Sequence, residues 1–153
     1  MARLYLMKKT LLPLLMSLVM ASCGGSVKEI SHDALPEKAR QFIGLYFQDM
    51  ECVRIVQKKD NGATGFEAYL TDGAKLEFDG RGEWTSLDCK FSALPNGVLP
   101  ENIITYIDNR YPDAVVRKAE KLPSGYEINI TRGGLYYNVH CTFVGAGHLI
   151  TEH

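Results

Sequence analysis

Histidine pairs and acidic side chains are the features of this chain that could do chemistry. If Ala146 and Gly147 form a tight turn, His140 and His153 lie opposite each other on neighbouring strands, with their Cβ atoms about 5 Å apart. Two imidazoles are fewer ligands than a metal site needs, and chain ends are often poorly ordered. Exposed histidines on a sheet are therefore the favoured interpretation, with metal binding as the alternative.

No combination of side chains predicts a catalytic centre. The sequence contains neither a G-x-S-x-G nor an H-E-x-x-H motif. Asp49 and Glu51 lie where a helical pattern gives way to a strand pattern, which is typical of a solvated junction rather than of an acid/base pair. Asp79 begins the turn "DGRG", which lacks the spaced acids and distal Glu of a calcium loop. We therefore predict that the protein is not an enzyme and has no catalytic residue, metal or cofactor.

The first 22 residues predict an export signal. Two lysines precede an apolar run from Leu11 to Met20, which is shorter than the roughly 20 residues that span a bilayer. The small residues before Cys23 resemble the lipobox of bacterial lipoproteins, in which the cysteine is lipidated and becomes the first mature residue. We expect residues 1–22 to be a lipoprotein signal peptide and Cys23 to be the lipid attachment site. An uncleaved anchor and a plain signal peptide are the alternatives.

The charge and the expected anchor limit the classes of partner. Loss of residues 1–22 removes three basic side chains and changes the formal net charge from −1 to −4. A mildly acidic chain without a basic run is a poor candidate for nucleic acid binding. We expect an exported protein that is held by its lipid alone on a bacterial membrane, at the periplasmic or outer-membrane face. Residues 23–34 predict a flexible tether.

One helical sequence motif occurs twice in the chain. "LPEKARQFIGLYFQ" begins at Leu35 and "LPENIITYIDNRYP" begins at Leu99, 64 residues later. Proline suits the first helical position, and the apolar residues that follow have the spacing of a one-faced amphipathic helix. After each helix the apolar period changes to two, and Asn-Gly, Asp-Gly and Gly-rich turns separate the runs. Each unit therefore predicts one helix followed by a four-stranded antiparallel meander.

The two units together predict an α+β tandem repeat. Residues 35–90 form the first repeat, residues 91–98 a connector and residues 99–153 the second repeat. A unit of about 60 residues is near the lower limit for an independent core, so we expect one shared curved sheet with both helices on one face. The first strand of each unit alternates poorly, which indicates a β-bulge or an edge position.

The sheet face that the helices leave open contains the candidate partner-binding residues, Tyr69, Trp84 and Tyr136. Tyr and Trp are enriched at interface hot spots, although cross-strand packing is the alternative for each of them. Trp84 follows a turn, so its side chain could face inward. Cys52, Cys89 and Cys141 allow one disulfide at most, and their spacing does not select a pairing.

The repeated motif resembles the PepSY-like proteins with a β-lactamase-inhibitor-like fold. It is carried by "LPEKARQFIGLYF…GFEAYLTDGAKLEFDGRGEW" in the first copy and by "LPENIITYIDNRYP…GYEINITRGG…FVGAG" in the second. The second copy departs from the pattern, with Val144 in place of Asp79 and Leu149 in place of Trp84. The resemblance implies a secreted or lipid-anchored, non-enzymatic protein whose open sheet holds an envelope protein or peptide, with inhibition as one possible outcome. A small-ligand or metal-binding envelope sensor, based on His140 and His153, is the alternative.

Overall fold

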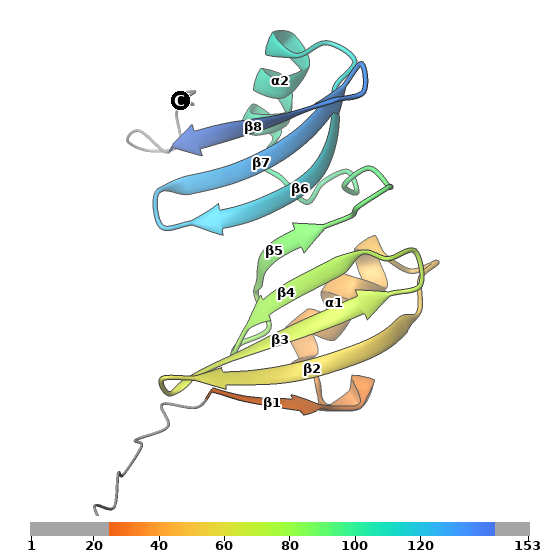
Figure 1. Cartoon of the computed structure of the whole chain (residues 1–153), viewed down its shortest axis with the longest axis vertical. Coiled ribbons are helices and arrows are strands. Elements are labelled where there is room, and N and C mark those ends of the chain that lie inside the picture. The colour runs from red at the N-terminus through yellow and green to blue at the C-terminus, as the bar shows by residue number, and fades with distance from the viewer. Residues whose placement is uncertain (1–24, 143–153) are drawn as a thin grey trace, which may run out of the picture.

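Within residues 25–142, which the computed structural model describes, eight strands form one antiparallel sheet in chain order (Figure 1). The strands are β1 (Ser26–Glu29), β2 (Cys52–Asp60), β3 (Ala63–Leu70), β4 (Lys75–Asp79), β5 (Trp84–Asp88), β6 (Val115–Leu122), β7 (Gly125–Arg132) and β8 (Leu135–Thr142). The helices of this part are α1 (Glu37–Tyr46), α2 (Glu101–Arg110) and a short 3-10 helix (His32–Ala34). The predicted α+β class is confirmed. The fourth strand predicted for the second repeat, residues 148–153, lies outside the described residues.

Both helices begin directly after the proline of a Leu-Pro-Glu motif. The glutamate that follows places a negative charge in the first turn, where the helix dipole favours it. Each helix buries two residues four positions apart, Ala39 and Ile43 in α1 and Ile103 and Ile107 in α2. The predicted amphipathic helices are therefore present, with their apolar stripes turned inward.

Side chains alternate between the two faces of the sheet, and we call the face with the buried apolar residues the core face. Phe66, Ala68 and Leu70 of β3 belong to it. The register between β3 and β4 places Phe66 opposite Phe78 and Ala68 opposite Leu76, which are also buried. Since a strand has a side-chain period of two, the residues between them point to the opposite face. We call that opposite face the polar face.

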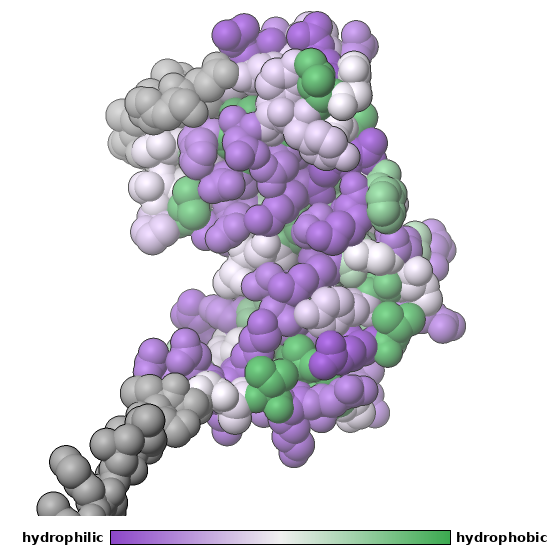
Figure 2. Space-filling view, in the orientation of Figure 1, coloured by the Kyte–Doolittle hydropathy of each residue, from purple (hydrophilic) through white to green (hydrophobic). Residues whose placement is uncertain are grey.

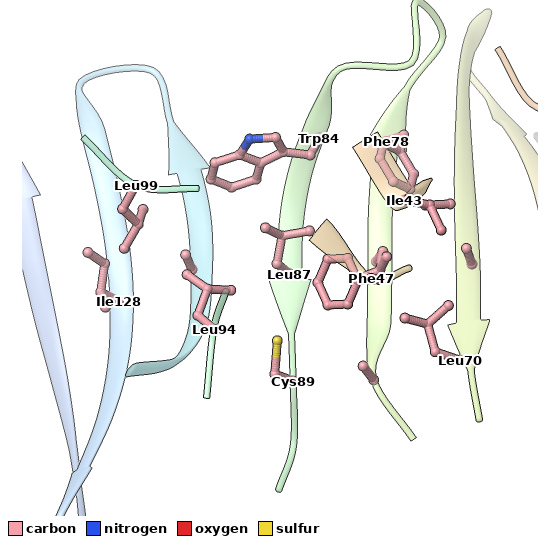
Figure 3. Packing of buried hydrophobic residues seen from close by; sticks show 14 of the residues in the cluster. Ile43, Phe47, Leu70, Phe78, Trp84, Leu87, Cys89, Leu94, Leu99 and Ile128 are labelled. Carbon is pink, nitrogen blue, oxygen red and sulfur yellow. The ribbon is translucent and has the colours of Figure 1, made fainter. Parts of the chain in front are cut away.

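One apolar cluster runs through the whole described part of the chain. It contains residues of α1, of α2 and of every strand from β2 to β8. We call residues 37–88, from α1 to β5, the first half and residues 101–142, from α2 to β8, the second half. The segment between them, residues 89–100, adds Leu94 and Leu99 to the cluster, as Figure 3 shows. The core therefore continues across the junction between β5 and β6.

The first strand of each meander is irregular, as its sequence indicates. The register shifts between Cys52 and Arg54 in β2 and between Val116 and Lys118 in β6. β2 lies between β1 and β3, and β6 lies between β5 and β7. The β-bulge prediction is therefore confirmed, and the edge-position alternative is wrong for both strands.

The prediction of a flexible tether over residues 23–34 is wrong for the described part of that segment. Ser26–Glu29 form β1, which pairs antiparallel with β2 from Ser26 opposite Lys59 to Glu29 opposite Val56. The 3-10 helix His32–Ala34 then leads into α1. A short polar segment gains a regular conformation here because β2 offers it a ladder of backbone hydrogen bonds, which local composition does not reveal.

Cys52, Cys89 and Cys141 are free thiols in the structure. Cys89 and Cys141 are buried, and burial raises the pKa of Cys89 to about 12 and that of Cys141 to about 11. Thiols with such pKa values stay protonated at neutral pH and react slowly.

None of the helices in residues 25–142 has the length and apolar character needed to cross a membrane.

Gly82, in the turn between β4 and β5, is where a single methyl group should disturb the fold. Its φ is +84°, and an added Cβ would lie 2.8 Å from Pro36 Cβ and 2.9 Å from the Ala39 backbone nitrogen. We expect Gly82→Ala to lower the free energy of unfolding by about 2–3 kcal/mol, because it combines backbone strain with a clash against the start of α1. Urea denaturation followed by circular dichroism measures the loss.

Gly62 provides the matched control for this substitution. It has a similar φ of +82°, but a Cβ added there would have no atom within 4 Å. Gly62→Ala should therefore cost only the backbone strain, about 1 kcal/mol. Equal losses in the two variants would show that contact with α1 does not restrict residue 82.

Candidate interaction surface

The polar face is a surface of charged and amide side chains. A row of residues that lie opposite one another crosses this face. Glu67 of β3 lies opposite Glu77 of β4, and Glu77 lies opposite Ser86 of β5. Ser86 in turn lies opposite Glu120 of β6. The same row continues to Glu127 of β7 and His140 of β8. In the orientation of Figure 1, Figure 2 shows mostly hydrophilic residues over the strands.

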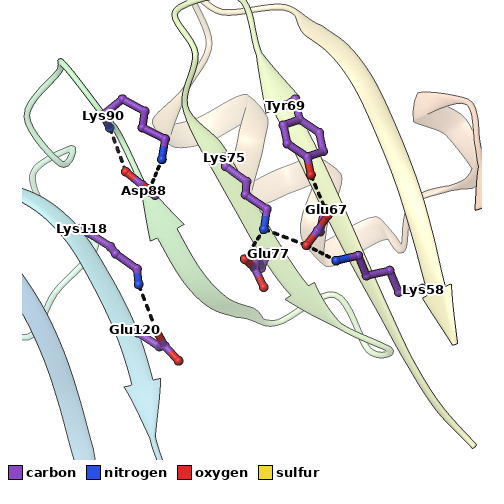
Figure 4. A network of polar contacts seen from close by, with 9 residues as sticks. All are labelled: Lys58, Glu67, Tyr69, Lys75, Glu77, Asp88, Lys90, Lys118 and Glu120. Atoms are coloured by element: carbon purple, nitrogen blue, oxygen red, sulfur yellow. Dashed lines mark hydrogen bonds and ion pairs between the residues drawn. The ribbon is translucent and has the colours of Figure 1, made fainter. Parts of the chain in front are cut away.

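Glu67 is the centre of an ion-pair network on this face (Figure 4). Its Oε1 atom lies 2.5 Å from Lys58 Nζ and 2.8 Å from Lys75 Nζ. The Tyr69 hydroxyl donates a hydrogen bond of 2.8 Å to Glu67 Oε2, and Lys75 also pairs with Glu77. Only 5% of the Glu67 side chain is exposed, although it points away from the core face. The carboxylate is therefore covered by its own partners.

This environment shifts the proton equilibria of the network. Burial works to raise the pKa of Glu67, but hydrogen bonds from Lys58, Lys75 and Tyr69 outweigh burial and lower that pKa to about 2. The hydrogen bond to Glu67 raises the pKa of Tyr69. Hydrogen bonds to Glu67 and Glu77 outweigh desolvation and raise the pKa of Lys75. Glu67 and Lys75 are therefore charged at neutral pH, and the phenol of Tyr69 is protonated.

Tyr69 lies on the polar face, as predicted, but it is half-buried in the network. The Arg54 guanidinium lies 5.7 Å and Lys75 Nζ 6.0 Å from the centre of its ring. These are cation–π distances, and they hold the ring in place together with the hydroxyl bond to Glu67. Its part in binding a partner stays a prediction.

Trp84 lies on the core face, so its predicted place on the open face is wrong and the inward alternative is right. It is 7% exposed and belongs to the apolar cluster. Its ring packs against Phe42 of α1 at 6.4 Å between ring centres and is stacked on Tyr126 of β7 at 6.0 Å. Figure 3 shows the indole extending from β5 toward the strands of the second half. Trp84 therefore joins the two halves.

Smaller ion pairs lie on each side of the junction between β5 and β6. Asp88 pairs with Lys90, and Lys118 pairs with Glu120 at 3.2 Å (Figure 4). His140 lies on the polar face opposite Glu127. His153 lies outside the described residues, so the predicted histidine pair stays a prediction. Cys23 also lies outside them.

Tyr136 is the most accessible of the three predicted contact residues. It is 80% exposed, and it lies on the polar face opposite Thr131. It lines a groove of about 390 Å³ together with Lys90, Phe91, Asp113, Val115, Arg117, Thr131, Arg132, Gly133 and Gly134. Three chain segments form this groove: the start of the connector, the α2–β6 turn with the beginning of β6, and the β7–β8 turn.

Sequence reasoning missed Glu67 and Arg117 as important residues of the polar face. A sequence signal existed for Glu67, since it alternates with Phe66 and Ala68 and so had to point away from the core. Its two lysine partners come from the neighbouring strands, and no local pattern selects them. Arg117 lies at the register shift of β6, and no local pattern places it beside the β7–β8 turn.

The fold places this chain in the class of α+β proteins with one open antiparallel sheet. More specifically, the chain belongs to the beta-lactamase-inhibitor-like, PepSY-like family, which residues 64–151 match. No match was found among curated proteins.

Solved structures of Bacteroides proteins are similar to this chain. A proposed periplasmic protein of the DUF2874 family from Bacteroides vulgatus ATCC 8482 is 35% identical with a TM-score of 0.68, over 69% of this chain and 84% of that one. A proposed calcium-regulated periplasmic protein from Bacteroides thetaiotaomicron is 31% identical with a TM-score of 0.68, over 74% and 88%. A proposed periplasmic protein of unknown function from B. vulgatus ATCC 8482 is 30% identical with a TM-score of 0.70, over 84% and 98%.

Proposed function

We propose that this chain is a non-catalytic binding protein of the cell envelope, whose polar face contacts a protein or peptide partner. The observation that carries the proposal is the accessible, ordered array of charges on that face. Lys58 and Glu120 expose 48% and 42% of their side chains, while ion pairs fix their positions. Preorganised charges reduce the ordering cost of binding and favour partners of complementary pattern. Inhibition of the partner is one form that such binding takes.

We infer that the two halves are copies of one unit and that both helices cover the core face. Each half begins with a helix after a Leu-Pro-Glu motif and continues into antiparallel strands, the first of them bulged. The apolar cluster includes residues of both helices, and both helices lie behind the strands in Figure 1. This arrangement leaves the polar face as the surface available to a partner.

The relatives support a place in the envelope. The three similar structures are of proteins assigned to the periplasm. We propose the same compartment here, with lipid attachment at Cys23 as the link to the membrane. A protein held in this way presents its polar face to soluble envelope proteins and peptides.

Site-specific photo-crosslinking tests the binding surface. A photoreactive amino acid at Asn138, which is exposed on the polar face, should give adducts of higher mass in cells that express the full chain. The same amino acid at Gln41, which is exposed on α1, is the matched control and should give none. Tyr136→Ala should reduce the adducts at position 138, because an exposed aromatic anchor near the crosslinker is lost. Adducts from position 41 alone would exclude the polar face.

The sensor alternative has one observation in its favour, the relative from B. thetaiotaomicron that is proposed to be calcium-regulated. Within residues 25–142, no group of three His, Cys, Asp or Glu side chains is placed to hold a metal ion. His153 lies outside that range. Metal binding through His140 and His153 therefore stays a prediction, and a thermal shift with calcium or zinc would support it.

A further inference from the structure

The groove beside Tyr136 is more cationic than the rest of the polar face. Its lining includes three basic side chains, Lys90, Arg117 and Arg132, and one acidic side chain, Asp113. Lys90 is paired with Asp88, which leaves the two arginines as the available positive charges. A volume of about 390 Å³ lies within the usual range of binding pockets.

Arg117 is held in the groove by neutral hydrogen-bond acceptors. Its Nε donates to Thr131 Oγ1 at 3.1 Å, and its Nη1 donates to the Phe91 carbonyl oxygen. Both acceptors are neutral, so the described contacts of this half-buried guanidinium orient it and leave it unpaired with any carboxylate. A planar, oriented guanidinium is well suited to bidentate contact with a carboxylate.

The segment that carries Phe91 is fixed against β6. The Cys89 N–H donates to the Arg117 carbonyl at 2.9 Å, and the Leu94 N–H donates to the Val116 carbonyl at 2.8 Å. Between these two anchors the Phe91 side chain is 86% exposed. Phe91 and Tyr136 therefore present two accessible aromatic rings beside the arginines. Large exposed aromatic side chains beside a charged pocket are typical of interaction sites.

We propose that this groove binds an acidic segment of the partner polypeptide, a refinement that rests on the proposed function. Carboxylates of the segment contact Arg117 and Arg132, and an apolar or aromatic side chain packs on Phe91 and Tyr136. A peptide fits better than an anionic membrane surface, whose recognition typically uses clusters of about four to eight basic residues. The acidic row of Glu120 and Glu127 on the same face would also repel such a membrane.

Fluorescence anisotropy with two labelled pentapeptides tests the groove in the full chain. The acidic probe is Glu-Asp-Phe-Asp-Glu, and the matched neutral probe is Gln-Asn-Phe-Asn-Gln. We expect the acidic probe to bind about tenfold more tightly or better, and Arg132→Gln or Arg117→Gln to weaken its binding about tenfold. Arg132→Gln is the decisive variant, because the Arg132 side chain is exposed and makes no hydrogen bond or ion pair among residues 25–142, so its replacement leaves the fold intact.

Arg81→Gln is the control for net charge. Arg81 is an exposed arginine in the β4–β5 turn, outside the groove, and its removal should leave the affinity for the acidic probe unchanged. Equal weakening by Arg81→Gln and Arg132→Gln would overturn the proposal, as would equal binding of the two probes. Tighter binding to anionic phospholipid vesicles than to the acidic probe, lost in Arg132→Gln, would overturn it in favour of a membrane. Crosslinking from position 138 without binding of the acidic probe would reject the groove while the proposed function stands.

Discussion

Trp84→Ala is expected to lower the free energy of unfolding by about 3–5 kcal/mol, the usual cost of truncating a buried Trp or Phe. The indole is 7% exposed, and it packs on Phe42 from the first half and on Tyr126 from the second. β5 and β6 are joined by three registered residue pairs, whereas β7 and β8 are joined by eight. The junction therefore depends strongly on side-chain packing. Denaturation followed by far-ultraviolet circular dichroism measures the loss, because the variant has no tryptophan left to report by fluorescence.

Tyr136→Ala serves as the control for Trp84→Ala. It also removes an aromatic side chain, but one that is 80% exposed, so its cost should stay within about 0.5 kcal/mol. Trp84→Phe should fall between the two because it retains part of the buried ring. If Trp84→Ala costs as little as Tyr136→Ala, the two halves are not joined through the indole.

Glu67→Gln is expected to lower the free energy of unfolding by about 2–3 kcal/mol at pH 7. The pKa of Glu67 falls from an ordinary value of 4.5 to about 2 in the folded protein. A carboxyl group with a depressed folded pKa stabilises the protein fully above its unfolded pKa. That contribution disappears as the pH falls from about 5 toward 2. The stability difference between the wild type and Glu67→Gln should therefore shrink over that range, as measured by urea denaturation at a series of pH values.

Glu77→Gln is the matched control for the buried carboxylate. Glu77 also pairs with Lys75, at 2.6 Å, but 38% of its side chain is exposed. An accessible ion pair of this kind contributes at most about 1 kcal/mol. If Glu67→Gln retains the full acid sensitivity of the wild type, the network around Glu67 does not account for that sensitivity.

Local rules predicted most of the fold correctly. The Leu-Pro-Glu motifs mark both helix starts, but each proline occupies the N-cap rather than the predicted first helical position. The glutamate is the first helical residue, where the helix dipole favours its charge. Period-two runs between glycine-rich turns predicted strands β2 to β8. Broken alternation indicated a bulge or an edge position in β2 and β6, and both strands have the bulge. Tyr69 and Tyr136 were placed on the correct face for the same reason, since neighbours in a strand point to opposite sides.

The face of Trp84 was not predictable in this way. The register shifts between Glu77 and Phe78, so Phe78 of the core face lies opposite Trp84. A shift of one residue moves a side chain to the other face, and the sequence contains no marker for the shift. The strand Ser26–Glu29 was missed for a related reason, because its regular conformation comes from pairing with β2 rather than from its own residues.

Local sequence patterns were therefore enough to predict both helices, strands β2 to β8 and most of the alternation of their faces, because these follow from the dihedral preferences and spacing of neighbouring residues. Long-range packing accounts for three other features. Lys58 and Lys75 cover Glu67, and Trp84 joins the two halves. Phe91, Arg117 and Tyr136 line one groove. Each of these depends on segments that are distant in the chain and become neighbours when strands pair and the two halves share a core.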